Sequence, residues 1–401
     1  MTDNIQMIKQ SVIQEVDRLK ESLVGLAKQI HANPELAFAE VQSAALLTGY
    51  LKEQGFDIEP NLGNIATAFR ATYQGSQSKP VIGLLAEYDA LPDIGHGCGH
   101  NLIATASVGA AVAIKNIYQN KSLPGQIQVI GTPAEEKGGG KILLLQSGVF
   151  NALDVAMMFH PDNKTIVDYY SLSNQGITVE FFGKASHAAV APEKGINALD
   201  AVLLSFSNIN ALRQHIVATS RIHGIINCGG KMVNVVPDYA SATVIVRALD
   251  NRYLDELVEK VLNCFRAAST ATGARLEYKL ADIRYAAMES NGTLAAMFGE
   301  NLNQLGIKVQ PSSPTSGFGS SDMGNVSQRV PAIHPKLAIA DPPISLHSPE
   351  FAQAAISDRG MAGLIAATKA LAMTSIDILQ DSNKLDTITF EFERKNLKRT
   401  K

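Results

Sequence analysis

The chain has 401 residues, of which 46% are hydrophobic and 18% are charged, and its formal net charge is −3. This length exceeds what one hydrophobic core usually supports, so two domains are expected. The small net charge argues against partners such as nucleic acid or an anionic membrane surface. We find neither an apolar run of ~18 residues nor a signal peptide. Three scattered cysteines make no disulfide framework, so the expected compartment is cytoplasmic.

The first half of the chain alternates between helical and strand patterns. Apolar residues at helical spacing predict helices over 5–30 and 40–54. Three short apolar runs then predict strands that are buried on both faces. These strands are 81–86, 126–131 and 154–159, and the helices between them are 102–118 and 138–147. This alternation predicts an α/β fold with a doubly wound, mostly parallel sheet.

The pattern changes near residue 173. The next predicted elements are a strand at 176–182, a helix at 196–213, strands at 222–228 and 240–247, a helix at 253–270 and a strand at 275–280. This β-α-β-β-α-β order is the ferredoxin-like split unit. We therefore predict a discontinuous α/β domain, residues 1–172 and 285–401, with a ferredoxin-like α+β domain inserted at 173–284.

The segment after the insertion is predicted to be mainly helical. Helices are expected at 292–305 and 349–373, and 386–393 is interpreted as a last strand. The Ser/Pro/Gly-rich run Ser312–Ser321 is interpreted as a mobile lid or as a turn that faces the substrate.

Polar side chains follow each of the three buried strands. The first strand is followed by Asp89 and the loop Gly95–His100, the second by Glu135 and Glu136, and the third by His160. Sites in parallel sheets form just beyond the carboxyl ends of the strands, so we expect these side chains to gather. Within the loop, Cys98 and His100 offer a thiolate and an imidazole two residues apart, between glycines. This pattern favours a metal site, or a nucleophile at Cys98.

Several of these residues also have a structural explanation. Cys98 can be a small buried hydrophobic residue, and Asp89 can cap a turn. Glu135 and Glu136 can be solvated acids that open the next helix. Adjacent side chains diverge, however, so one Glu can hold a metal while its neighbour reaches the metal's water. In such a site Asp89 would hydrogen-bond a metal-bound histidine.

The remaining histidines differ in what they indicate. His160 and His347 are interpreted as further metal ligands, although His347 can also be a turn residue before a helix. We assign no role to His31 or His96, and we expect surface or structural positions for His215, His223 and His334.

Together these motifs resemble the amidohydrolase branch of the aminoacylase and carboxypeptidase-G-type metallopeptidases. That branch includes hippurate hydrolase, auxin-conjugate amidohydrolases and aminobenzoyl-glutamate hydrolase. The resemblance covers nearly the whole chain through HANPEL at 31–36, EYDALP at 87–92, HGCGHN at 96–101, PAEE at 133–136, GKASHAA at 183–189, NVVPDYA at 234–240 and HSPEF at 347–351. The stretch at 319–335 resembles the dipeptidase-like subgroup.

The resemblance implies a binuclear metal centre. Its ligands would be Cys98, His100, Glu136, His160 and His347. Glu135 would be the general base, and Asp89 would orient a ligand. The two divalent ions are expected to be Zn²⁺, with Mn²⁺ as the alternative.

The resemblance also implies roles for the inserted domain. It would be the dimerisation domain of a homodimer. His187, Asn234 and Arg247 would bind substrate, with His187 reaching the active site of the partner subunit. Two positions depart from the family, because Glu87 stands where the broader family has His and Asn101 where many members of the branch have Asp.

The expected function is hydrolysis of an amide bond in N-acyl amino acids or dipeptides with a free carboxylate. Metal-activated water would attack, Glu135 would take its proton, and Arg247 would hold the carboxylate. One alternative is a thiol hydrolase with Cys98 as nucleophile, but it leaves His160 and His347 unexplained. The other is a non-catalytic relative that binds a small ligand or a partner.

Overall fold

The computed structural model describes residues 2–118, 124–313 and 319–399. It divides the chain into two compact units. Unit 1 comprises Met1–Tyr169, Met288–Ser313 and Asn325–Lys401, and unit 2 comprises Tyr170–Ala287 and Pro314–Gly324. The main segment of unit 2 starts and ends three residues outside the expected insertion. The lid or substrate-facing turn predicted at Ser312–Ser321 falls largely on 314–318, outside the described residues.

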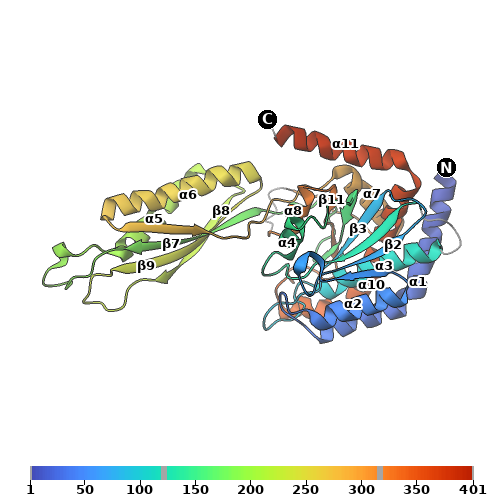
Figure 1. Cartoon of the computed structure of the whole chain (residues 1–401), viewed down its shortest axis with the longest axis horizontal. Coiled ribbons are helices and arrows are strands. Elements are labelled where there is room, and N and C mark those ends of the chain that lie inside the picture. The colour runs from blue at the N-terminus through green and yellow to red at the C-terminus, as the bar shows by residue number, and fades with distance from the viewer. Residues whose placement is uncertain (1, 119–123, 314–318, 400–401) are drawn as a thin grey trace. The chain divides into compact units, whose positions relative to one another are not determined.

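A six-stranded sheet forms the centre of unit 1 (Figure 1). Its order is β1-β2-β4-β3-β5-β11, and the last four of these strands run parallel. The strands are β1 (Asp57–Pro60), β2 (Phe69–Gln74), β3 (Val81–Ala86), β4 (Gln126–Gly131), β5 (Val155–Met157) and β11 (Ala332–Ile333). The predicted mostly parallel sheet is confirmed. The antiparallel edge β1–β2 was not predicted.

Helices pack against this sheet in layers. Helix α3 (His100–Ile117) lies on β3 and β4, and both α1 (Thr2–Ala32) and α10 (Asp358–Gln380) pack against α3. Close approach requires Gly109, because a Cβ there would lie 2.7 Å from a Leu23 methyl carbon. The other helices of unit 1 are α2 (Val41–Glu53), η1 (Leu62–Asn64), α4 (Gly140–Gln146), α7 (Gly292–Gln304), α9 (Pro349–Ala354) and α11 (Ser382–Arg399).

Helix α10 is, among the described helices, the one long and apolar enough to span a membrane. Of its most apolar stretch, 83% is buried within the structure. Burial of this kind is what the core helix of a globular domain shows. Its composition therefore follows from its central position between α1, α3 and α7.

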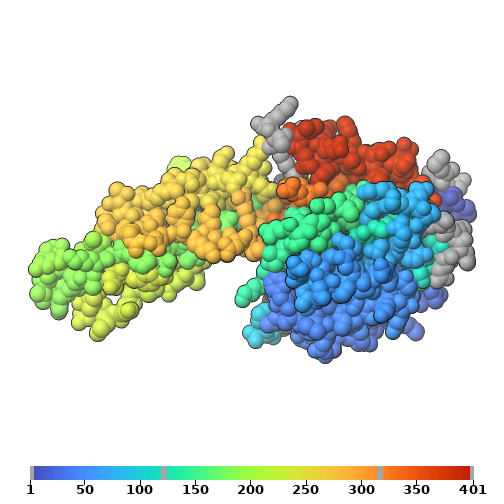
Figure 2. Space-filling view, viewed as in Figure 1, coloured from blue at the N-terminus to red at the C-terminus, as the bar shows by residue number. Residues whose placement is uncertain are grey.

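Two expectations for the end of the chain are wrong. The single helix expected over 349–373 is two helices, because Ser357 caps α10 and accepts a hydrogen bond from the Gly360 amide. The strand expected over 386–393 lies within helix α11, on the outer surface of unit 1 (Figure 2). Ile388 is fully buried and Glu391 accepts hydrogen bonds at the start of α7, so helix packing outweighs the local alternation.

Unit 2 has the predicted ferredoxin-like fold. Its antiparallel sheet has the order β10-β7-β9-β8, and α5 and α6 pack on it. The elements are β7 (Ser173–Phe182), η2 (Pro192–Lys194), α5 (Ala198–Leu212), η3 (Arg213–His215), β8 (Arg221–Cys228), β9 (Tyr239–Ala248), α6 (Asn251–Thr272) and β10 (Arg275–Leu280). Helix α8 (Met323–Ser327) includes the last residues of unit 2 and the first of the final segment of unit 1.

Candidate active site

The predicted ligands do gather at the ends of the strands of unit 1. Ligand atoms of Cys98, His100 and His160 lie within 4.8 Å of one another, as do those of Cys98, Glu136 and His347. A third such group joins His100 to Glu135 and Glu136. The five predicted ligands therefore form two overlapping sets that share Cys98.

A glycine and a short pair of strands allow the loop Gly95–His100 to lie close to Pro161 and His347. Gly99 has a φ of +71°, and a Cβ there would lie 2.6 Å from the Pro161 ring, so the loop can approach this close only with glycine. His160 and Pro161 begin β6 (His160–Asp162), which pairs in parallel with β12 (Lys336–Ala338). On the other side, the amide of His347 donates to the Gly97 carbonyl at 3.0 Å.

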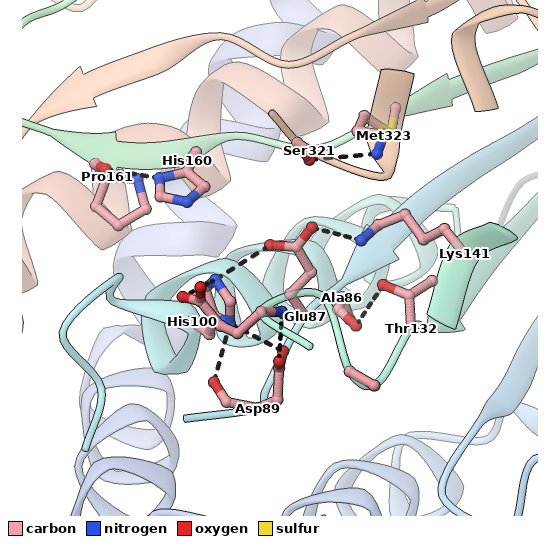
Figure 3. Close-up of polar contacts among 12 residues, drawn as sticks. Ala86, Glu87, Asp89, His100, Thr132, Lys141, His160, Pro161, Ser321 and Met323 are labelled. Atoms are coloured by element: carbon pink, nitrogen blue, oxygen red, sulfur yellow. Dashed lines mark hydrogen bonds and ion pairs between the residues drawn. The ribbon is translucent and has the colours of Figure 1, made fainter. Parts of the chain in front are cut away.

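Asp89 holds two of the predicted ligands, and Figure 3 shows it beside one of them, His100. Its Oδ1 lies 3.0 Å from Nδ1 of His100, and its Oδ2 accepts a hydrogen bond from the Glu136 amide at 2.9 Å. This leaves Nε2 of His100 able to coordinate a metal ion, and that atom has no hydrogen-bond partner among the described residues. Asp89 therefore orients His100, in the way that a carboxylate orients a metal-bound histidine in many metal sites.

Burial and neighbouring charges shift the protonation of the cluster. Burial acts to lower the pKa of His100, but the Asp89 carboxylate, together with Cys98 and Glu87, raises that pKa well above its usual range. Burial lowers the pKa of His160 well below its usual range, and Lys336 adds to this, so His160 is a neutral imidazole. Burial raises the pKa of the Cys98 thiol, which opposes a metal-free thiolate nucleophile.

The donor set fits divalent metal ions. It combines one thiol, three imidazoles and a carboxylate, and it is mostly buried. Oε1 of Glu136 is buried without a hydrogen-bond partner among the described residues, as is Nε2 of His100. Nδ1 of His160 lies 2.7 Å from the Pro161 carbonyl, which leaves Nε2 for a metal. Buried polar atoms of this kind are normally satisfied, and a bound cation would satisfy them.

A buried ion pair borders the cluster, and no motif in the sequence indicates it. Nζ of Lys141 lies 2.5 Å from Oε1 of Glu87, and neither side chain is exposed (Figure 3). Oε2 of Glu87 is 3.5 Å from Nε2 of His100. At the position where the broader family has a histidine, this chain therefore has a carboxylate that is neutralised by lysine.

The substrate-binding residues expected in unit 2 do not come together within one chain. His187 and Asn234 are exposed and lie side by side, because the Ala188 amide donates to the Asn234 carbonyl at 3.0 Å. Arg247 lies near the opposite end of β9, eight residues beyond Tyr239, which is about 27 Å along a strand. Its Nη1 donates to Oγ of Ser320 at 3.0 Å.

A buried cluster of thiol, imidazole and carboxylate groups at the strand ends of an α/β sheet defines a metal-dependent hydrolase. Comparison with known proteins agrees. Residues 83–356 match the model of peptidase family M20/M25/M40. The chain is 36% identical to the Xaa-Arg dipeptidase of Mus musculus, over 98% of this chain and 93% of that protein. It is 28% identical to a p-aminobenzoyl-glutamate hydrolase chain of Escherichia coli K12, over 97% of this chain and 96% of that one.

A solved structure shares the fold. The Bacillus subtilis YXEP protein, a dinuclear metal binding peptidase from the M20 family, superposes with a TM-score of 0.71 at 20% identity, over 91% of this chain and 99% of that one. The chain belongs to peptidase family M20/M25/M40, and it is an amide-bond hydrolase. The resemblance inferred from its motifs is confirmed.

Proposed function

We propose that this hydrolase uses two divalent metal ions per subunit and Glu135 as its general base. The convergence of the five predicted ligands supports the metal centre. Glu136 belongs to a ligand set with Cys98 and His347, whereas Glu135 belongs to no set of the described residues that contains Cys98. Neighbouring side chains thus take different positions, which suits one as a ligand and the other as a base.

Each residue then has a defined part in the reaction. When bound, the ions lower the pKa of coordinated water towards ~7 and polarise the scissile carbonyl. Glu135 accepts a proton from the attacking water and donates it to the leaving nitrogen as the carbon–nitrogen bond breaks. Asp89 keeps the Nδ1 proton on His100, so Nε2 stays available as a ligand. Cys98 and the imidazoles favour Zn²⁺, and Mn²⁺ is the second candidate.

We propose substrates that carry a free carboxylate on the leaving amino acid. Arg247 would hold this carboxylate, because its guanidinium is half-buried and its Nε has no hydrogen-bond partner among the described residues. The mouse relative is called an Xaa-Arg dipeptidase, and the Escherichia coli relative an aminobenzoyl-glutamate hydrolase. Both names describe an amide bond to an amino acid, so dipeptides and N-acyl amino acids are the substrates of first choice.

We further propose a homodimer formed through unit 2. Strand β8 is an edge strand, and Ile225 is 67% exposed on it, which leaves an apolar edge ready to pair with another chain. Val233, in the loop beside Asn234, is also fully exposed. Pairing of two such edges would allow His187 of one chain to serve the site of the other. Ile225→Lys should convert the dimer to monomer in analytical ultracentrifugation and lower activity.

A substrate panel tests the proposed reaction. The metal-reconstituted enzyme is assayed for amine release from dipeptides and N-acyl amino acids, each beside its C-terminal carboxamide. We expect kcat/KM to fall at least tenfold for every carboxamide, mainly through KM, because the charge-assisted contact to Arg247 is lost. Equal kcat/KM for acid and amide would contradict a carboxylate-binding role.

A further inference from the structure

A buried lysine lies directly beside the metal cluster. Lys336 is opposite His160 in the parallel β6–β12 pair, and paired residues in a sheet project to the same face. The side chain of Lys336 is only 6% exposed. Its Nζ lies 4.5 Å from the centre of the Tyr169 ring, and no carboxylate of the described residues forms an ion pair with it. A buried ammonium group without a counter-ion is costly to the folded protein.

His334 is the second unusual group in this place. It is 1% exposed, so it is not a surface histidine. Its ring centre lies 5.4 Å from that of His160 and 5.3 Å from that of Tyr169. Neither ring nitrogen has a hydrogen-bond partner among the described residues. A neutral imidazole has one N–H donor, so an unused donor lies beside the unused cation.

The two groups share one requirement, which is an anionic acceptor. An additional metal ion at this position, beyond the two proposed, would be repelled by the ammonium group, and an apolar group would leave both donors unsatisfied. A carboxylate would accept from both, since its two oxygens offer about four acceptor positions. Because His160 belongs to the proposed metal site, an anion held here would be attached to the substrate.

We infer that Lys336 and His334 form a subsite for a carboxylate on the acyl part of the substrate. This inference rests on the proposed function, in which Arg247 holds the carboxylate of the leaving amino acid. The enzyme then prefers acyl groups derived from dicarboxylic acids. It disfavours acyl groups whose far end carries an ammonium group, because Lys336 repels that charge.

Three substrates with one leaving group test this subsite. N-Succinyl-, N-butyryl- and N-(4-aminobutyryl)-arginine differ only at the far end of the acyl chain, which is anionic, neutral or cationic. For wild type we expect kcat/KM to be at least tenfold higher for succinyl than for butyryl, and lowest for the cation. Lys336→Met should bring the ratio of kcat/KM for succinyl-arginine to kcat/KM for butyryl-arginine near one. His334→Phe should lower this succinyl-to-butyryl ratio.

The controls separate charge recognition from folding. Lys164 is exposed in the same unit, so Lys164→Met makes the same change of net charge and should leave the ratio as in wild type. Lys336→Met removes a buried charge that forms no ion pair with the described residues, so its thermal midpoint should equal or exceed that of wild type. A succinyl-to-butyryl ratio that is near one in wild type, or that Lys336→Met leaves unchanged, would overturn the inference.

Binding keeps the subsite testable if none of the three substrates is hydrolysed. That outcome would count against the proposed substrates, and the subsite would then be judged by calorimetry with succinate and the Zn²⁺-loaded protein. Wild type should bind succinate, and Lys336→Met should bind it at least tenfold more weakly. Equal binding by both proteins, or none by wild type, would overturn the subsite.

Discussion

Asp89 and His100 lie 3.0 Å apart, from Oδ1 to Nδ1, and both side chains are almost completely buried. The second oxygen of Asp89 accepts from the Glu136 amide, so one carboxylate positions two predicted ligands on different segments of the chain. Burial acts to raise the pKa of Asp89, but the charge and hydrogen bond of His100, the Glu136 amide and the charge of Lys141 together lower that pKa. The carboxylate is therefore ionised and ready to support a metal-bound imidazole.

Asp89→Asn should weaken metal binding about 10- to 100-fold, because the amide keeps the shape of the side chain but not its charge. Competition with a chromophoric chelator measures this affinity. Asp93 is an exposed acid in the same loop, so Asp93→Asn is the matched control and should bind metal as wild type does. Equal metal affinity in both variants would show that Asp89 does not support metal binding.

Glu135→Gln should lower kcat by about 10²- to 10⁴-fold while both metal ions stay bound, because a general base contributes about this much. Amine release and elemental analysis of the same sample measure the two quantities. Glu350→Gln changes an exposed acid of unit 1 and should retain full activity. If Glu135→Gln were as active as wild type, a different group would have to be the base.

A buried ion-pair network links three helices of unit 1. Asp377 on α10 lies 2.6 Å from Nζ of Lys9 on α1 and 2.6 Å from Nζ of Lys384 on α11. Asp377→Ala leaves Lys9 buried without its counter-ion and should lower the free energy of unfolding by about 3–5 kcal/mol. Urea unfolding followed by circular dichroism measures this.

An exposed ion pair provides the comparison for that network. Glu259 pairs with Arg266 on α6, where both side chains are largely in solvent. Glu259→Ala should change the free energy of unfolding far less than Asp377→Ala does, because solvent screens an exposed pair. If Asp377→Ala had an equally small effect, the buried network would not be a major source of stability.

The attachment of α11 should depend on pH. Burial acts to raise the pKa of Glu391, but the Lys395 ammonium and hydrogen bonds from Thr293 and Gly292 lower it to about 2. A carboxyl group with a lowered folded-state pKa stabilises the protein above its unfolded-state pKa, 4.5 here. This stabilisation is lost as the pH falls from about 4.5 towards 2.

Comparison with a variant isolates this contribution. Glu391→Gln lacks the titrating group, so wild type should have the higher thermal midpoint at pH 7. At pH 3 the difference between the two proteins should be smaller. A difference that stays constant from pH 7 to pH 3 would contradict the role given to Glu391.

The parts of the fold that follow from local pattern could be predicted. The run Val81–Ala86 is apolar throughout and is buried throughout as β3, so its sequence pattern matches its position in the structure. The segment 386–393 alternates like a strand, but it lies in α11. Burial of Ile388 and the contacts of Glu391 with α7 decide its structure, and they depend on residues almost 100 positions away.

The same distinction applies to the site. Cys98, His100 and Glu136 follow strand ends, and their gathering could be expected from sheet topology alone. The pairing of Lys141 with Glu87 could not, because a lysine after three glycines resembles an exposed residue in a turn. His334 was expected at the surface or in a structural role, since only the pairing of β12 with β6 brings it beside His160.

The central claim is that Cys98 joins two sets of ligands in one binuclear centre. Titration of the metal-free protein with Zn²⁺, with amine release measured at each addition, tests it most directly. Wild type should bind two ions per subunit and gain activity as they bind, and Glu135→Gln should bind two without gaining activity. Cys98→Ala should lose high-affinity binding at both positions. Tight binding of two ions by Cys98→Ala, or full activity of the metal-free wild type, would contradict the account.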